Sequence, residues 1–198
     1  MQDRETKEAS GFATRAGRGL RLCWRRASLA ALGFAAFLAL EAVGVPATAA
    51  APSDPPKSVA LLDVQFLNDH GDLEPTTSAE RARLGLIASL FKAKLEASGR
   101  YRFLPVPADA QAKIAAGPEI GACGGCEFSY GKELGADYAA WIVVQKVSDL
   151  ILNINVYMAD VAAKKMAFVH SVDIRGNTDE SWTRGLTYLV KNYLLPSP

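Results

Sequence analysis

The sequence predicts a single mixed α/β (α+β) domain, in which a five-stranded sheet is packed with helices. Three strand patterns follow one another between Gly135 and Gly176, joined by tight turns, which is typical of an antiparallel meander. Before them a strand, a helix and a second strand alternate, and this order favours parallel pairing through a crossover. A helical pattern closes the chain. The predicted order is therefore β-α-β-α-(α)-β-β-β-α.

The first 49 residues are expected to be a cleaved export signal. Arginines cluster before an uncharged, largely apolar stretch at residues 27–40, and Ala47-Thr48-Ala49 supplies the small residues that a signal peptidase needs. The apolar stretch is shorter than the roughly 20 residues of a membrane-spanning helix. Cys23 precedes this stretch, whereas the cysteine of a lipoprotein would lie at the cleavage site. We therefore expect a periplasmic protein with no stable membrane anchor after cleavage.

Removal of the signal changes the charge of the chain. The whole sequence has 22 Lys+Arg and 21 Asp+Glu; residues 1–49 hold 7 and 4 of these, which leaves 15 and 17, a net charge of about −2. No basic stripe with interleaved aromatic residues remains, so we expect no nucleic-acid partner. Residues 50–58, rich in proline, are predicted to be a polar tether. Residues 59–195 are long enough for one domain with its own core.

The first half of the domain reads as a crossover unit. Val59–Leu67 is predicted to be a buried strand, and a loop follows it. Ser78–Ala97 has apolar residues at three-to-four spacing and is predicted to be a helix capped by Ser78. Gly99 ends this helix, and Tyr101–Val106 is predicted to be a short strand.

The second half begins with two shorter helices, predicted at Ala108–Ala116 and Glu127–Leu134, on either side of a glycine-rich turn. The three meander strands follow. Thr178–Leu194 carries an apolar stripe and is predicted to be the closing helix, with Asn177 and Glu180 as its capping pair.

Several strings in the chain carry a family resemblance. "LEPTT", "ACGGC", "VQKVSDLILNIN" and "DIRGNTDESW" resemble an uncharacterised family of secreted bacterial proteins that has no assigned activity. More distantly, residues 58–176, with "LGADY" before the meander, are similar to the amino-terminal domain of TolB. The resemblance implies the fold and, by analogy, an accessory role in the cell envelope. Unlike TolB, this chain has no propeller repeats after the domain.

Cys123 and Cys126 are the cysteines that remain after signal cleavage, and they form a C-G-G-C motif. In an oxidising compartment this spacing indicates a local disulfide. A redox pair would need an exposed, low-pKa thiol at a helix N-terminus, and Cys126 lies just before a predicted helix. A metal site would need further ligands. The disulfide is the leading interpretation, and the redox and metal alternatives stay open.

Two other groups of polar residues could carry a function. Asn153, Asn155, Ser171, Asp173 and Arg175 lie on the meander strands at alternate positions, so they could form a surface that binds a polypeptide or a small polar ligand. A solvated face of an antiparallel sheet explains the same pattern. The loop after the first strand offers weak candidates for metal ligands, which turn chemistry equally explains; they are Asp69, His70, Asp72 and Glu74.

No catalytic signature is visible in the sequence. It lacks G-x-S-x-G, H-E-x-x-H and G-x-G-x-x-G motifs, and its two histidines are far apart. We therefore expect no catalytic activity and no cofactor. The leading hypothesis is a periplasmic binding or envelope assembly-accessory module whose partner is an envelope protein or a small polar ligand. The alternative is a small thiol-redox or metal-handling protein that uses Cys123 and Cys126.

Overall fold

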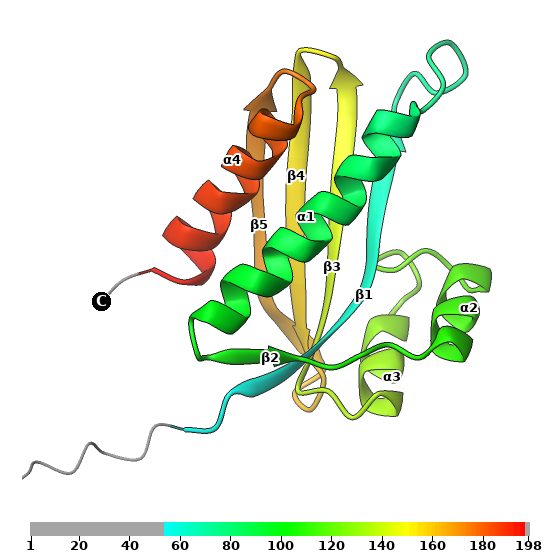
Figure 1. Cartoon of the computed structure of the whole chain (residues 1–198). Coiled ribbons are helices and arrows are strands. Elements are labelled where there is room, and N and C mark those ends of the chain that lie inside the picture. Colours follow the sequence, from blue (N-terminus) through cyan, green and yellow to red (C-terminus); the bar gives the residue numbers. More distant parts are fainter. Residues whose placement is uncertain (1–53, 197–198) are drawn as a thin grey trace, which may run out of the picture. The chain divides into compact units, whose positions relative to one another are not determined.

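The computed structural model describes residues 54–196 (Figure 1). The predicted export signal therefore lies outside the described residues. In chain order the elements are β1 (Lys57–Asn68), α1 (Ser78–Ala97), β2 (Tyr101–Phe103), α2 (Ala108–Ala116), α3 (Cys126–Glu133), β3 (Tyr138–Ser148), β4 (Ile151–Asp160), β5 (Lys165–Arg175), α4 (Asp179–Leu189) and a π-helical turn, η1 (Val190–Leu194).

The strands form one mixed five-stranded sheet in the order β2-β1-β3-β4-β5. β1 pairs in parallel with both β2 and β3, while β3, β4 and β5 form the antiparallel meander. This arrangement confirms the predicted fold class and element order. The crossover from β1 through α1 puts β2 at one edge of the sheet, and the meander puts β5 at the other.

Helices cover both faces of the sheet, but unequally. α1 and α4 pack on one face, where Phe91, Trp182 and Leu186 meet the apolar side of β3 and β4. α2 and α3 pack on the other face over the start of β1 and β3, around Trp141. Leu152, Ile154, Val156 and Met158 are all buried in the larger core, so the predicted register of β4 is confirmed.

The start of the sheet is fastened by a side-chain clamp. Asp137 Oδ2 accepts hydrogen bonds from the Ser58 hydroxyl at 2.6 Å and the Ser58 N–H at 2.7 Å, and Asp137 N–H donates to Ser58 Oγ at 2.9 Å. These bonds from Ser58 hold the pKa of Asp137 below its usual range. β1 therefore begins at Lys57, so residues 57–58 belong to the sheet and not to the predicted tether.

Both predicted helix caps are one residue away from the observed ones. α1 is capped by Thr77: its hydroxyl accepts from Glu80 N–H at 3.1 Å, and Glu80 Oε2 accepts from Thr77 N–H at 2.6 Å. Ser78 could not form this reciprocal box because an arginine stands three residues after it, and arginine has no acceptor. α4 is capped in the same way by Thr178 with Ser181, which releases Asn177 for other contacts.

Candidate functional site

The outer edge of β1 is bare over the second half of the strand. Among the described residues, β2 pairs with β1 at Lys57, Ser58 and Val59 alone. Pro105 and Pro107 follow β2, and a proline nitrogen has no hydrogen to donate to a sheet. The observed strand β2, Tyr101–Phe103, is shorter than the predicted strand Tyr101–Val106. Leu104 N–H still donates to the Val59 carbonyl at 2.9 Å, and the chain then leaves the sheet for α2 (Figure 1). Beyond these residues, the outer edge of β1 is, in the described part of the chain, free to pair with a sixth strand.

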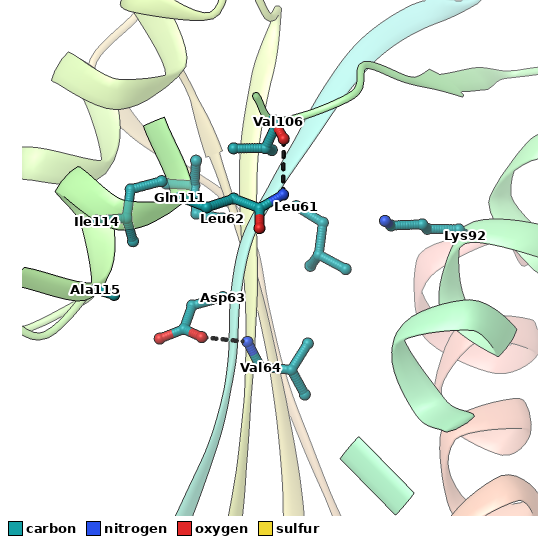
Figure 2. A pocket seen from close by; sticks show the side chains of 9 residues that line it. All are labelled: Leu61, Leu62, Asp63, Val64, Lys92, Val106, Gln111, Ile114 and Ala115. Atoms are coloured by element: carbon teal, nitrogen blue, oxygen red, sulfur yellow. Dashed lines mark hydrogen bonds between the residues drawn. The ribbon is translucent and has the colours of Figure 1, made fainter. Parts of the chain in front are cut away.

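A β-bulge marks the beginning of this bare edge. The register of β1 on β3 steps from Leu61↔Ala140 to Asp63↔Trp141, so Leu62 is an extra residue. The Asp63 side chain turns back, and its Oδ1 accepts a hydrogen bond from Val64 N–H at 2.8 Å (Figure 2). Bulges and charged side chains keep edge strands from pairing with unspecific neighbours. Asp63 therefore limits unspecific pairing of other strands with this edge.

Two cavities follow the edge of β1, and together we call them the edge groove. The first has a volume of about 350 Å³ and the second about 430 Å³. They share Asp63, Ile114 and Ala115, so the groove is continuous along the strand. Lys92 of α1 and Ile114 of α2 approach from opposite sides of β1 (Figure 2). The groove is thus a slot between two helices, with a strand edge as its floor.

The walls of the edge groove are mixed in chemistry. Ile114 and Leu62 give the α2 side an apolar base, and Asp63 and Glu119 give it two carboxylates. Lys92 lies on the α1 side. An apolar base with a few charged groups around it is typical of a ligand-binding groove.

One polar atom in the groove has no partner. Gln65 lines the second cavity, and its Nε2 donates to the carbonyl of Ile120 at 3.4 Å. Its Oε1 is buried and accepts no hydrogen bond, the one such side-chain atom found in the described part of the chain. Buried acceptors without partners are rare in folded proteins. A donor on a bound ligand would satisfy this oxygen.

A second polar cluster lies where α1, β3, the β3–β4 turn and the β5–α4 turn meet, and we call it the buried ion cluster. Lys146 Nζ is 3.0 Å from Glu80 Oε1 and 2.8 Å from Asp149 Oδ1. Asn177 Nδ2 donates to the same two carboxylates, and its Oδ1 accepts from Trp182 Nε1 at 3.1 Å. The cluster joins α1, β3, the β3–β4 turn and the β5–α4 turn.

The charges of this cluster compensate one another. Burial raises the pKa of Glu80, but hydrogen bonds from the Thr77 backbone, Lys146, Asn177 and the Thr77 hydroxyl outweigh it and lower this pKa from 4.5 to about 2. The hydrogen bond to Asp149 is the largest cause that raises the pKa of Lys146. Glu80 and Lys146 are 1% and 4% exposed, and every polar atom of the pair is engaged. This closed arrangement stabilises the fold and leaves no group poised for chemistry.

The predicted polar surface of the meander is partly assembled. Asn153 Nδ2 donates to Asp173 Oδ1 at 2.8 Å, and Ser171 Oγ donates to Asn153 Oδ1 at 2.7 Å. Asn155 instead donates to the backbone carbonyl of Val143. Arg175 lies opposite Ile151 in the sheet, and no ion pair joins it to Asp173 among the described residues. Three of the five candidates thus form a ladder whose groups satisfy one another.

Cys123 and Cys126 form a disulfide at the start of α3. Gly124 and Gly125 both have positive φ, which lets the short loop close. Cys126 N–H points at Cys123 Sγ from 3.2 Å, and Glu127 Oε2 lies 3.2 Å from the same sulfur. Cys123, Cys126 and Glu127 are also the group in the described chain whose ligand atoms lie close enough to hold a metal ion. The disulfide withdraws both thiols from such a site.

The loop after β1 does not gather its metal-ligand candidates. Asp69 accepts from Gln145 Nε2, and Glu74 Oε2 is 3.6 Å from Lys146 Nζ. His70 and Asp72 are exposed, and no metal-ligand group within the described residues includes any of the four. Asn68 Nδ2 donates to the Glu74 carbonyl, so turn chemistry shapes the loop.

Sequence reasoning missed both the edge groove and the buried ion cluster. Two signals were present: Thr77 and Glu80 have capping-box spacing, and Lys146 interrupts an apolar strand. Pro105 and Pro107 likewise mark the region in which a strand ends. None of these signals places the residues beside their partners, which come from distant parts of the chain.

The chain was compared with known proteins. A family model described as "Protein of unknown function (DUF2380)" matches residues 57–194. None of the curated proteins searched is similar enough to count as a match.

The chain is also similar to several solved structures. One is the LpoB C-terminal domain from Salmonella enterica, with 11% identity over 63% of this chain and 86% of that chain and a TM-score of 0.43. Others are lipoprotein GNA1162 from Neisseria meningitidis (17%, 72% and 99%, TM-score 0.48) and TolB from Acinetobacter baumannii (14%, 69% and 28%, TM-score 0.40). The predicted resemblance to an uncharacterised family is confirmed. No helix in the described residues is long and apolar enough to cross a membrane.

Proposed function

We propose that this chain, which belongs to the family described as "Protein of unknown function (DUF2380)", is a non-catalytic binding module of the cell envelope that takes a partner polypeptide in its edge groove. The observation that carries the proposal is the groove itself. It combines a bare strand edge, two contiguous cavities and a buried acceptor, Gln65 Oε1, that has no partner within the described chain.

The absence of catalysis is part of the proposal. The described groups with the strongest pKa shifts are Glu80 and Lys146, and strongly shifted groups in a cleft are the usual candidates for acid–base catalysis. Here they neutralise each other inside the fold and line neither cavity of the groove. The groove itself supplies Asp63, Lys92, Gln111 and Glu119, a set suited to recognition by charge and hydrogen bonding.

Location in the envelope is supported by two features of the chain. The basic, apolar and small-residue pattern before Ala50 is that of an export signal. The disulfide between Cys123 and Cys126 fits an oxidising compartment.

The test is site-specific photo-crosslinking in living cells. A photoreactive residue replaces Gln111 or Ala115, which line the groove, or Lys132 of α3 as a control, all three being exposed. We expect discrete crosslinked products with another polypeptide at the two groove positions and none at Lys132. Equal products at all three positions, or none at any, would contradict the proposal.

A second candidate function rests on the contact between Cys126 N–H and Cys123 Sγ, because a helix N-terminal amide stabilises a thiolate. The neighbouring Glu127 carboxylate opposes this effect. Free thiols are counted in the native protein after titration with a thiol–disulfide buffer. If the Cys123–Cys126 disulfide is reduced as readily as the disulfide of the buffer, the result supports redox exchange. If it stays oxidised, the result supports a structural disulfide.

A further inference from the structure

Resting on the proposed function, we infer that the edge groove binds its partner by strand addition: an extended segment with basic side chains on alternate residues becomes a sixth strand beside β1. The bare edge, the flanking helices and the carboxylates on one wall each contribute to this inference.

The backbone of β1 presents hydrogen-bonding groups to the groove. Asp69 N–H donates to the Lys146 carbonyl of β3, so residue 69 points its backbone groups toward β3. Backbone groups alternate in direction along a strand, and those of Val64 and Phe66 therefore point outward. The bond from Val64 N–H to the side chain of Asp63 agrees with this direction. No turn, cap or loop hydrogen bond of the described residues reaches the backbone of Phe66.

The slot has the shape that a strand requires. A neighbouring strand lies about 4.8 Å from β1 and sends alternate side chains to the two faces of the sheet. In the edge groove those faces meet Lys92 of α1 on one side and Gln111 and Ile114 of α2 on the other (Figure 2). An added strand would thus be held by main-chain bonds to β1 and by side-chain contacts with both helices.

Charge selects the occupant. Side chains on the α2 side of an added strand would meet Asp63 and Glu119, which carry like charges. On the α1 side they would meet Lys92. Lysine or arginine at every second position, pointing to α2, therefore complements the groove, whereas acidic residues at the same positions are repelled.

Asp63 has two roles in this arrangement. It covers Val64 N–H in the free protein, and it offers its carboxylate to a basic side chain of the incoming strand. Neutral or acidic strands must displace the same hydrogen bond without a charge partner in return. Asp63 thereby makes the edge selective for basic strands. Charges on other edge strands only prevent pairing, whereas this one also favours a particular partner.

The experiment uses the protein purified from the periplasm and capped eight-residue peptides of alternating lysine and valine. The control peptide has glutamate in place of lysine. We expect the lysine peptide to slow hydrogen exchange at the amides of Val64 and Phe66 and to bind at least about tenfold more tightly than the glutamate peptide. Protection along β5, the other edge of the sheet, with none at β1 would overturn the inference.

Backbone methylation separates strand addition from other binding. One lysine–valine peptide is N-methylated at its lysines and a second at its valines. With lysines held on the α2 side, only one of these two sets of N–H groups faces β1, so one peptide should lose binding about tenfold or more and the other should keep it. Equal binding of the two peptides would overturn strand addition.

Variants of Asp63 complete the test. Asp63→Ala removes the cover from Val64 N–H and the charge together, while Asp63→Asn keeps an oxygen acceptor at the same place. Both variants should lose most of the preference for lysine over glutamate, and only Asp63→Ala should bind a valine–threonine peptide more tightly than the parent protein. An undiminished preference for lysine in both variants would overturn the role of Asp63.

The outcomes also distinguish the inference from the proposed function. Crosslinked products at Gln111 and Ala115 in cells, without protection of Val64 and Phe66 by the peptides, would overturn strand addition and leave the binding module standing. Absence of both results would overturn the two together.

Discussion

At the scale of single residues, Glu80 and Lys146 are a buried pair of opposite charges. Each is buried, and each has partners from at least two elements. A buried charge without its partner is far more costly than a buried pair, because its desolvation is no longer offset. These two side chains therefore bind α1 to the end of β3, and their loss should be felt by the whole domain.

The first prediction concerns this pair. Lys146→Met should lower the free energy of unfolding by about 3 kcal/mol or more, because it leaves the Glu80 carboxylate buried without its cation. Chemical denaturation at pH 7 measures the loss. Lys132→Met, at an exposed site on α3, is the control and should change stability by less than about 0.5 kcal/mol. Similar losses of stability in the two variants would show that the buried pair contributes no more to stability than an exposed lysine.

The second prediction concerns acid. The pKa of Glu80 is about 2 in the folded protein and near 4.5 when unfolded, so the unfolded chain takes up the proton first. The stabilisation from this group is therefore fully present above pH 4.5 and is lost as pH falls towards 2. Between pH 5 and pH 2, the free energy of unfolding should fall less steeply with decreasing pH for Glu80→Gln than for the parent protein, as measured by chemical denaturation at each pH. Parallel curves would contradict the prediction.

At the scale of elements, glycine decides how closely α4 can approach the sheet. A Cβ atom on Gly185 would overlap Cγ2 of Ile174 on β5, so the helix lies on the strand without a side chain between them. The same approach carries Trp182 and Leu186 into the core. Gly85 in α1 has open space around its Cα, which makes it a matched contrast.

The third prediction compares these two glycines. Gly185→Ala should destabilise the protein by about 1–3 kcal/mol because the added methyl group overpacks the interface. Gly85→Ala should stabilise it by up to about 1 kcal/mol, because alanine favours a helix and meets no neighbour. Thermal melts of the two variants, and of Gly185→Ala combined with Ile174→Ala, test the argument. The double variant should be no less stable than Ile174→Ala alone, because the alanine at 185 then meets no Cγ2 atom.

The fourth prediction concerns the element boundary before α3. Replacing Cys123 and Cys126 with serine should lower stability by no more than about 2 kcal/mol, because the closed loop is short. Crosslinking through the edge groove should be unchanged. A normal melt with lost crosslinking would instead favour the redox or metal hypothesis for this pair.

At the scale of the whole molecule, the sheet has one edge that the fold leaves open between two helices. The early crossover places β2 beside β1 but ends it after three residues, while the late meander fills the opposite side of the sheet. A binding site at an edge needs no catalytic motif, so the lack of such motifs in the sequence is compatible with a specific function.

The fifth prediction concerns the mature form of the molecule. The pattern that ends at Ala47-Thr48-Ala49 predicts that protein recovered from the periplasm begins close to Ala50. Intact mass spectrometry of the secreted protein measures its first residue. Recovery of the full-length chain in the inner membrane would contradict cleavage.

Much of the fold was predictable because it depends on local patterns. Alternation along Ile151–Met158 shows which side chains are buried, and the spacing of apolar residues marks the long helix Ser78–Ala97. The cap of α1 was wrong by one residue because Thr77 and Ser78 are both good capping residues, and the choice depends on which side chain three positions on can accept a hydrogen bond. The cap of α4 was wrong by one residue because Asn177, which also has an acceptor three positions on, is engaged instead with Glu80, Asp149 and Trp182. The strand β2 was predicted, but its end was placed at Val106 instead of Phe103, because Pro105 and Pro107 after it were not weighed as signals of a break.

The sequence by itself determined the order of the elements, the faces that β4 and β5 bury and the short cysteine loop, since each depends on residues that are neighbours in the chain. Only the tertiary structure decided the buried ion cluster and the edge groove. Glu80, Lys146 and Asn177 meet across separations of 66 and 97 residues. Asp63 and Ile114 face one cavity because β2 stops early and α2 folds back past the strand. Such contacts have no local periodicity, because they arise only when the sheet brings distant segments together.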